Sequence, residues 1–528
     1  MNHKRWILLL VFILGFGVAV GQDGLTVIWA EDIGQADNLD PRVSSSRHVA
    51  QAIIQMFDQL IYADEDANVY PGLAKSWEVS EDQLSWTFQL RDDVTFHDGT
   101  PFNAEAVKYT FDTIVDPALG SRAAIDLIGP YESTEVLSEF VARVNFSRPF
   151  AAALSAFTTW QVGSMVSPTA GRSLGIDGFA RNPVGTGPFR FVSWEEGKEI
   201  IMERNPDYDW APEFYAHSGP SEVERVVIRF IPDAGTRAAA LEVGEVNVAD
   251  LMPARDMQRY RNSRDIGILV GNVAGLPLSV LLNYSRGPLE DILVRKAFLH
   301  SINRPRISET LFFGFAEPAY GPIGSATPMY WPGVEEYYNY DPEQAAALLD
   351  EAGWVDTNGD GVREKDGQDL DLFFAASVEP ETAVAVQGDA NKVGFNVMVE
   401  QVTFAHEKGI VEANQADLTF LRWVSLDPGI MIIPFHSRNI PTPGHFGFNW
   451  SRVDEPDLDR LLEAGESATS VEEREEIYRE VQQRISELAI SLAVHEQVQT
   501  IAYDAELTGF RFAPGRWQVR FYDVSRAN

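Results

Sequence analysis

The N-terminal part of the chain carries apolar residues in patterns typical of β-strands. Leu25–Ala30 is a short apolar run without alternation, which predicts a central strand buried on both faces. Leu84–Leu90 has a large apolar side chain at every second position, which predicts a strand with one buried face. Phe189–Val192 and Lys198–Arg204 predict a β-meander, and Val223–Ile231 predicts a further strand.

Helical patterns lie between these strands and dominate the middle of the chain. One early helix, with Ser44–Ser46 as candidate caps, has an apolar stripe of Val49, Ile53, Phe57 and Leu60. Asn103 is predicted to cap the next helix. Asp341-Pro-Glu-Gln344 combines a cap, a first-turn proline and a capping-box glutamine, and Gly353 is predicted to end that helix. Thr469-x-x-Glu472 predicts another helix start.

The order of these patterns predicts two lobes, one interrupting the other. Strand patterns come first, helices follow, and strands return at Thr500–Tyr503, Gly509–Phe512 and Gln518–Tyr522. A chain of 528 residues is also longer than one core comfortably supports. We expect the first crossing between lobes within Val270–Asn283 and the second within Gln497–Tyr503. A ligand-binding cleft between the lobes follows from this organisation.

The composition of the chain excludes several kinds of binding partner and several kinds of chemistry. The formal net charge of −36 argues against nucleic acid and against an anionic membrane surface. The chain has no cysteine, which excludes disulfides, thiolate nucleophiles, cysteine-ligated metals and a lipid anchor on an N-terminal cysteine. Histidines are scattered without the paired helical spacing of a zinc enzyme, so neither a metal nor a cofactor is predicted.

The first residues have the order of a secretory signal peptide. A short basic region precedes the apolar run Trp6–Val20, and small residues follow before Gly21. The run is shorter than the roughly 20 residues that a membrane span needs. We therefore expect a signal peptide at 1–21, cleavage near Gly21/Gln22, and a mature protein that is periplasmic or extracellular.

Three local motifs have a chemical and a structural interpretation. Gly185-Thr-Gly187 resembles a phosphate loop, but Pro188 removes a backbone donor and a strand follows, so the glycines are predicted to mark a turn. Gly171-Arg-Ser173-Leu-Gly175 matches a nucleophile elbow, yet no helical stripe follows it. Asp356-Thr-Asn-Gly-Asp360-Gly begins like a calcium loop, but Gly367 stands where a bidentate glutamate is needed, which favours a turn.

Several longer motifs carry a resemblance to a known family. Asn182-Pro-Val-Gly-Thr-Gly-Pro-Phe189 followed by Arg204-Asn-Pro-Asp-Tyr208 resembles the hallmark of family 5 extracellular solute-binding proteins, receptors of peptide, nickel and oligosaccharide ABC importers. Further matching segments, in the expected order, are Tyr70–Trp77, Trp86–Arg91, Phe96–Phe102, Glu290–Phe298 and Ala345–Gly353. The resemblance covers nearly the whole predicted mature chain.

The resemblance implies an α/β fold, the two-lobed periplasmic-binding-protein type called cluster C, with an extra subdomain in the first lobe. We expect lobe I at 22–275 with the subdomain at about 70–185, lobe II at 276–499, and a return to lobe I at 500–528. The implied protein is a monomer without catalysis or cofactor. It captures a peptide or similarly sized solute, an oligosaccharide or a nickel complex, and delivers it to a membrane permease.

Candidate ligand-binding residues are Trp423, Arg422, Asp427, Trp160 and His436. Trp160 and Trp423 each follow an apolar run and precede a loop, so each is a ligand platform or a core residue. Arg422 offers a donor fork and Asp427 an acceptor, although Asp427 next to a proline also fits a turn cap.

One departure from the peptide-binding members of the family bears on the ligand. Those members have an aspartate three residues after the tryptophan, and here that position is Leu426. A buried ammonium group needs a paired carboxylate, so the departure weakens the expectation of a free peptide. Two other classes stay open: a secreted serine hydrolase using Ser173, and a chaperone or adhesion protein that uses the cleft for unfolded chains.

Overall fold

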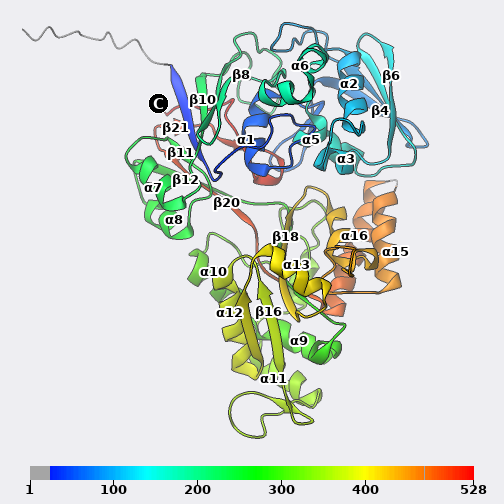
Figure 1. Cartoon of the computed structure of the whole chain (residues 1–528), viewed down its shortest axis with the longest axis vertical. Coiled ribbons are helices and arrows are strands. Elements are labelled where there is room, and N and C mark those ends of the chain that lie inside the picture. Colours follow the sequence, from blue (N-terminus) through cyan, green and yellow to red (C-terminus); the bar gives the residue numbers. More distant parts are fainter. Residues whose placement is uncertain (1–23, 469, 528) are drawn as a thin grey trace, which may run out of the picture.

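The computed structural model describes residues 24–468 and 470–527, and the predicted signal peptide lies outside them. The described chain folds into two lobes joined by a narrow middle (Figure 1). Lobe I, at the top of the view, holds the N-terminal and C-terminal strands, and lobe II lies below it. This two-lobed mixture of helices and sheets confirms the predicted fold class.

Lobe I is built around a seven-stranded sheet. In spatial order its strands are β12 (Ile266–Asn272), β20 (Val498–Asp504), β11 (Val248–Ala249), β1 (Leu25–Glu31), β10 (Val223–Phe230), β9 (Glu199–Arg204) and β8 (Phe189–Glu195). β1 pairs in parallel with both β10 and β11, so it is the central strand that its apolar run predicts. β8, β9 and β10 pair antiparallel, which confirms the predicted meander.

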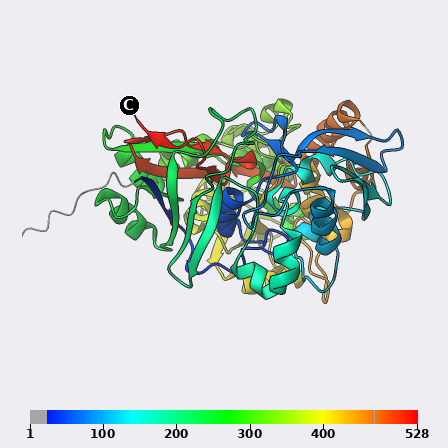
Figure 2. The ribbon, with the colours of Figure 1, turned by 90° about the horizontal axis from the view of Figure 1, so that it is seen from above.

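A second sheet forms a subdomain beside the first, and Figure 2 shows the two sheets at opposite ends of lobe I. Its order is β4 (Ala74–Val79), β5 (Ser85–Leu90), β7 (Val141–Phe146) and β6 (Tyr131–Ser138). The alternating residues of β5 behave as predicted, because Phe88 and Leu90 are buried in the subdomain core. The helices of this region are α2 (Ala104–Ile114), α3 (Ala123–Leu127), α4 (Ala153–Phe157), α5 (Trp160–Gly163) and α6 (Pro168–Arg181).

The remaining elements of lobe I complete its two cores. Its other helices are α1 (Arg47–Met56), α7 (Ala234–Glu242) and α8 (Ala254–Tyr260). Short strand pairs are β2 (Ile61–Ala63) with β3 (Val69–Pro71), β21 (Leu507–Thr508) with β24 (Ser525–Arg526), and β22 (Arg511–Phe512) with β23 (Val519–Arg520). Val49 and Ile53 of α1, and Phe57 directly after it, are buried against the main sheet as predicted. Leu60, the fourth residue of the predicted stripe, lies beyond the helix end at Met56 and is buried in the subdomain core.

Lobe II contains a five-stranded sheet covered by helices. The sheet order is β17 (Asn396–Gln401), β16 (Asp371–Ala376), β18 (Leu418–Val424), β13 (Gly275–Leu282) and β19 (Ser491–His495). β16 is parallel to both β17 and β18. A small hairpin joins β14 (Glu364–Lys365) to β15 (Gln368–Asp369).

Helices surround the sheet of lobe II. They are α9 (Ile292–Ser301), α10 (Arg304–Phe312), α11 (Pro342–Glu351), α12 (Pro380–Ala390), α13 (Phe404–Glu412), α14 (Ile432–Phe435), α15 (Pro456–Ser467) and α16 (Val471–Leu488). The Asp341 side chain caps α11 as predicted, by accepting a hydrogen bond from the Gln344 amide at 2.9 Å. The Ser470 side chain caps α16 by accepting a hydrogen bond from the Glu473 amide, and Thr469, the predicted cap, lies outside the described residues.

Single turns of 3-10 helix complete the fold. They are η1 (Gly287–Glu290), η2 (Pro332–Glu336), η3 (Asn391–Val393), η4 (Pro428–Met431), η5 (Ser437–Asn439) and η6 (Pro514–Arg516).

The chain changes sheets at two places. β12 belongs to the lobe I sheet and β13 to the lobe II sheet, with Val273 and Ala274 between them. β19 and β20 are separated in the same way by Glu496 and Gln497. The lobe boundaries at 275 and 499 stay predictions, since they concern which parts move as units.

The Gly185-Thr-Gly187 motif is part of the lobe I core. A side chain added at Gly185 would meet the Met56 carbonyl oxygen at 2.2 Å, so the chain passes α1 too closely for any other residue. Thr186 is buried and donates a hydrogen bond at 2.9 Å to Asp58, which is also buried. The motif is therefore a packing feature.

Asp58 is the polar centre of this core. Besides Thr186 it accepts hydrogen bonds from Tyr62 at 2.7 Å, Tyr208 at 3.0 Å and the Trp210 indole at 2.8 Å. Burial raises the pKa of Asp58, and the four donors counter part of that rise. The network joins α1 to the end of the meander, because its donors come from segments far apart in the sequence.

Replacing Thr186 with valine is expected to destabilise the protein by about 1.5–3 kcal/mol, the contribution of a hydrogen bond to a charged group. Thr186→Ser keeps the hydroxyl donor and is the matched control, expected to lose less. Urea unfolding of both variants measures the difference. Equal stability of Thr186→Val and wild type would contradict the structural role of the motif.

Candidate functional site

The carboxyl ends of parallel strands from both lobes meet at the junction between the lobes. In α/β sheets such ends are where ligands bind. In lobe I, β1 ends at Glu31 and β11 is followed by Asp250. In lobe II, Arg422 and Trp423 lie in the last three residues of β18, and Glu379 follows β16 just before α12. Figure 1 shows β1 running down toward lobe II and the ribbon of β18 at the upper side of lobe II.

Three side chains of lobe I form a compact polar cluster, which we call the Glu31 cluster: Glu31, His48 and Asp250. Their nearest ligand atoms all lie within 4.8 Å of one another. Nδ1 of His48, in the first turn of α1, is 2.8 Å from Oε1 of Glu31. Glu31 and Asp250 are each 2% exposed, while His48 is half-buried.

The burial of these groups changes their protonation. Burial raises the pKa of Glu31 to about 7, and it also raises that of Asp250, with the neighbouring Glu31 charge adding to the rise. Burial lowers the pKa of His48 to about 4, helped by the Arg47 charge. At neutral pH His48 is therefore a neutral imidazole beside two carboxyl groups that share negative charge.

Two arginines from opposite lobes face this region. The Arg47 guanidinium lies 3.9 Å from the ring centre of Trp517, and its buried Nη1 has no hydrogen-bond acceptor among the described residues. Burial lowers the pKa of Arg47, and the charge of Arg422 from lobe II lowers it further, although Asp250 and Glu31 counter the shift. Two like charges are thus brought close across the junction.

Arg422 is held at the junction by an ion pair. Its Nη1 lies 2.7 Å from Oε1 of Glu379, and its side chain is 42% exposed. Oε2 of Glu379 lies 2.9 Å from Nε2 of His495, which ends β19 beside the second crossing. Burial acts to raise the pKa of Glu379, but the hydrogen bond and charge of His495 and the charge of Arg422 outweigh it and lower that pKa.

Trp423 lies between the core of lobe II and the junction. Its side chain is half-buried, and its ring makes an edge contact with Phe448 at 5.0 Å between centroids. Its carbonyl accepts a hydrogen bond at 3.0 Å from Gln497 of the second crossing. One side of Trp423 therefore packs in lobe II while the rest of the ring stays partly exposed, so its role as a ligand platform stays a prediction.

Asp427 is engaged within lobe II. It forms a two-pronged ion pair with Arg474 at 2.7 and 2.8 Å, and its Oδ1 caps η4 by accepting from the Gly429 amide at 2.7 Å. Leu426, next to it, lies beside Gly515 of the C-terminal segment, where an added side chain would meet it at 3.6 Å. An apolar side chain thus faces lobe I at the position where peptide-binding members have an aspartate.

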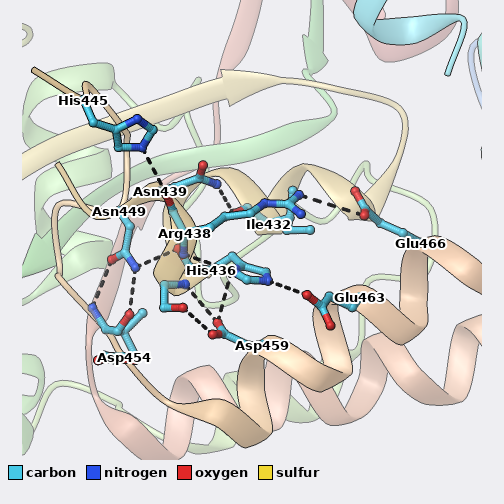
Figure 3. A network of polar contacts seen from close by, with 12 residues as sticks. Ile432, His436, Arg438, Asn439, His445, Asn449, Asp454, Asp459, Glu463 and Glu466 are labelled. Carbon is cyan, nitrogen blue, oxygen red and sulfur yellow. Dashed lines mark hydrogen bonds and ion pairs between the residues drawn. The ribbon is translucent and has the colours of Figure 1, made fainter. Parts of the chain in front are cut away.

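His436 belongs to a separate network between α14 and α15 (Figure 3). It is 5% exposed, and its Nε2 lies 3.2 Å from Glu463. Its Nδ1 accepts a hydrogen bond from the Arg438 amide at 3.1 Å, so the neutral ring donates from Nε2. Asp459 ties the same loop to α15 through the Ser437 amide at 2.9 Å. These contacts place His436 in packing between elements of lobe II.

Trp160 is the first residue of α5 and is half-buried against the core around β1. The core that Trp160 packs against includes neither Arg422 nor a residue of the Glu31 cluster. Of the five predicted contacts, the structure brings Arg422 and Trp423 to the junction with the lobe I cluster.

The motifs that match a nucleophile elbow and a calcium loop both have structural roles. Ser173 is exposed within α6, where its hydroxyl bonds to the Ala170 carbonyl at 3.2 Å, so it is not on the strand-to-helix turn that a nucleophile elbow requires. Asp356 accepts from the Gly359 and Gly361 amides at 2.6 and 3.1 Å, which builds a tight turn. Asp356, Asp360 and Glu364 do lie together there, but Asp356 and Asp360 are exposed and Glu364 only half-buried.

Sequence reasoning missed the lobe I half of the site. Glu31 and Asp250 are 219 positions apart, and they meet because β11 is parallel to β1 in the sheet. The sequence feature that could have indicated these residues is an acidic residue at the end of each apolar strand.

Two small surface hollows lie elsewhere, one beside Arg42 and Tyr109 in lobe I and one beside Trp354 and Lys365 in lobe II. Among the described helices, none combines the length and apolarity that crossing a membrane requires.

Comparisons with known proteins agree with this architecture. Residues 68–439 match the family model described as "Bacterial extracellular solute-binding proteins, family 5 Middle". The chain is 25% identical to the nickel-binding periplasmic protein of Escherichia coli (strain K12), covering 96% of this chain and 95% of that protein. It is 26% identical to the "Probable D,D-dipeptide-binding periplasmic protein DdpA" of the same strain, over 98% of each.

A solved structure supports the same conclusion. NikA from Brucella suis, in complex with Fe(III)-EDTA, superposes with a TM-score of 0.82 and 25% identity, covering 95% of this chain and all of that one. The family match spans well over half of the chain, from the lobe I subdomain to the loop after α14. The chain belongs to the bacterial extracellular solute-binding proteins of family 5.

Proposed function

We propose that this protein is the extracytoplasmic receptor of an ABC importer, which captures a peptide or a solute of similar size between its lobes. The captured solute is then delivered to a membrane permease. The relatives support this proposal, because one is named for nickel binding and another for D,D-dipeptide binding, and both are named as periplasmic. The receptor works as a monomer and does not transform its ligand.

The observation that carries the proposal is the pair of guanidinium groups at the junction. Arg47 comes from lobe I and Arg422 from lobe II, and each is positioned by neighbours from its own lobe. Guanidinium forks bind carboxylates in two-pronged geometry. A solute carrying a carboxylate would relieve the repulsion between the two arginines, and closing the lobes around it would bring both donors to one group.

Loss of either arginine is expected to weaken binding of a carboxylate-bearing ligand by about 1.5–3 kcal/mol, roughly 10- to 100-fold. The ligand is found first by thermal-shift screening of peptides, sugars and metal chelates, since binding to the native state raises the Tm. Titration calorimetry then compares Arg47→Ala and Arg422→Ala with wild type.

Arg460→Ala is the matched control, because its side chain is 70% exposed and, among the described residues, its ion-pair partner is its helix neighbour Asp457 alone. This variant should bind as wild type does. Two results contradict the proposal: a protein stabilised only by neutral oligosaccharides, or a carboxylate ligand whose affinity is the same in all three arginine variants.

Replacing Trp423 with alanine is expected to weaken ligand binding by roughly 1–3 kcal/mol while the unliganded Tm changes little. Trp450→Ala is the control from the same aromatic cluster, since Trp450 is 4% exposed and stacks on Phe448. Its loss should cost roughly 3–5 kcal/mol of stability and leave affinity intact. If Trp423→Ala behaves as Trp450→Ala is expected to, Trp423 is a core residue.

Export with removal of the signal peptide is part of the proposal. The basic, apolar and small-residue order of 1–21 is the basis for it. N-terminal sequencing of the protein expressed in a bacterial host is expected to begin near Gln22. A purified protein that begins at Met1 and stays in the membrane fraction would refute this part.

A further inference from the structure

The backbone of Glu379 has a conformation that is costly for a residue with a side chain. It lies in the left-handed region, at φ 45° and ψ 58°, directly before Pro380. Such a residue persists only where its surroundings hold it. Although Glu379 is the N-cap residue of α12, its side chain makes no capping hydrogen bond among the described residues. Its carboxylate is instead engaged by Arg422 and by His495.

The hydrogen bonds of His495 require a proton on both ring nitrogens. Its Nδ1 lies 2.8 Å from the carbonyl oxygen of Glu496, and its Nε2 lies 2.9 Å from Oε2 of Glu379. A carbonyl oxygen and a carboxylate oxygen only accept hydrogen bonds, so both nitrogens must donate. A neutral imidazole has one donor nitrogen, and these two contacts therefore indicate an imidazolium.

A proton on Glu379 would satisfy the same geometry, but its neighbours oppose it. Burial acts to raise the pKa of Glu379, yet the hydrogen bond and charge of His495 and the charge of Arg422 lower it overall. The Thr382 hydroxyl also donates to Oε2 of Glu379 at 3.2 Å. One carboxylate thus lies between two cations, and the three groups together have a net positive charge.

We propose that Glu379 and the imidazolium of His495 position Arg422 for a carboxylate-bearing solute. The inference rests on the proposed capture of such a solute at the junction. Glu379 fixes where the guanidinium lies, and the charge of His495 offsets that of Glu379, so Arg422 keeps its attraction for a second carboxylate. Because His495 is bonded to Glu496, the arrangement is anchored at the second crossing between the lobes.

Carboxyl groups at the two crossings favour the charged form of His495. Burial raises the pKa of Glu496 to about 7, with the Glu317 charge adding to the rise and the His495 charge opposing it. Oε2 of Glu317 accepts a hydrogen bond from Asn272, the last residue of β12, at 3.1 Å. As these groups ionise, they hold the proton on His495 together with Glu379.

Helix α10 packs against the other side of His495. The Phe312 ring lies 4.3 Å from the His495 ring between centroids, and an aromatic face stabilises a nearby cation. Arg304, at the start of α10, donates to the Ala319 carbonyl at 3.1 Å, and the Ala319 amide bonds to Val494 beside His495. Phe312 therefore supports the charge on His495, and the Arg304 charge opposes it.

The affinity for a carboxylate solute is expected to depend on pH through His495. A bound carboxylate attracts the imidazolium, so binding takes up protons and is tightest where the ring is charged. Histidine loses this charge as the pH rises from about 5.5 to about 8.5. Removing one charge several ångströms from the solute in a partly hydrated site should lower the affinity about fivefold. Glu31 of lobe I, with a pKa of about 7, titrates in the same range, so the decisive quantity is the difference between wild type and His495→Gln.

Titration calorimetry at both pH values measures that difference. The probe is N-acetyl-trialanine, which has a carboxylate and no ammonium group. His495→Gln should bind it about fivefold more weakly than wild type at the lower pH and equally well at the higher pH. His300→Gln is the control, because His300 is half-buried in α9 and bonded to the Asn339 carbonyl at 2.9 Å. It should match wild type at both pH values.

Nitrogen-15 NMR of the histidine rings tests the protonation of His495 without any solute. At about pH 6 we expect both ring nitrogens of His495 to carry a proton. Glu379→Gln should shift the loss of that proton to lower pH, because it removes the carboxylate that stabilises the charge. The ring signals are assigned by their loss in His495→Gln. If that variant does not fold, the close approach of Phe312 assigns them in wild type.

The outcomes separate this inference from the proposed function. A neutral His495 ring in the NMR experiment overturns the inference, and so does a His495→Gln protein that binds more weakly by the same factor at both pH values. Arg422→Ala binding as tightly as wild type, or no binding of N-acetyl-trialanine together with none of any other carboxylate solute, refutes the proposed function instead. The ring spectrum then still decides the protonation of His495.

Discussion

The hydrogen bonds between the two chain crossings are the constraint on which the site depends. The Val273 amide donates to the Gln497 carbonyl at 2.8 Å, and the Gln497 side chain donates to the carbonyls of Leu276 and Trp423. The first crossing is thereby fixed to the second, and both are fixed to the end of β18. Because Gly275 passes so close to Trp423 that an added side chain would lie 2.1 Å from its carbonyl oxygen, this junction tolerates little rearrangement. Arg422 and Trp423 are consequently held at the junction between the two lobes.

The electrostatics of the junction follow from bringing strand ends of both lobes to one place. Burial favours the neutral forms of Glu31 and Asp250, whereas Glu379 is kept ionised by Arg422 and His495. The protein has a net charge of −36, so the two arginines at the junction are a local departure from its overall charge. Each arginine has an acidic or aromatic neighbour that stabilises its charge, namely Glu379 for Arg422 and Trp517 for Arg47. Aromatic faces at Trp423 and Trp517 supply apolar contact that does not depend on charge.

Local patterns in the sequence predicted most elements of the fold, and the three-dimensional site only in part. The apolar run of β1, the alternation in β5 and the cap at Asp341 act over a few residues, so they could be read directly. The Glu31 cluster could not, because Glu31 and Asp250 become neighbours only through the order of strands in a sheet. For Asp427, the proline that follows it already indicated a cap, and Arg474 of α16 completes that arrangement from 47 residues away. Burial of His436 against α15 likewise depends on helix packing, which the sequence around it does not reveal.

The central claim is that one solute contacts both lobes at the carboxyl ends of their strands. Hydrogen–deuterium exchange with and without a ligand identified by thermal shift tests it most directly. The account predicts slower exchange on both sides of the junction, in the segments 246–252 and 421–425, together with the crossings. Protection confined to one lobe, or to the surface hollows near Tyr109 or Trp354, would contradict it.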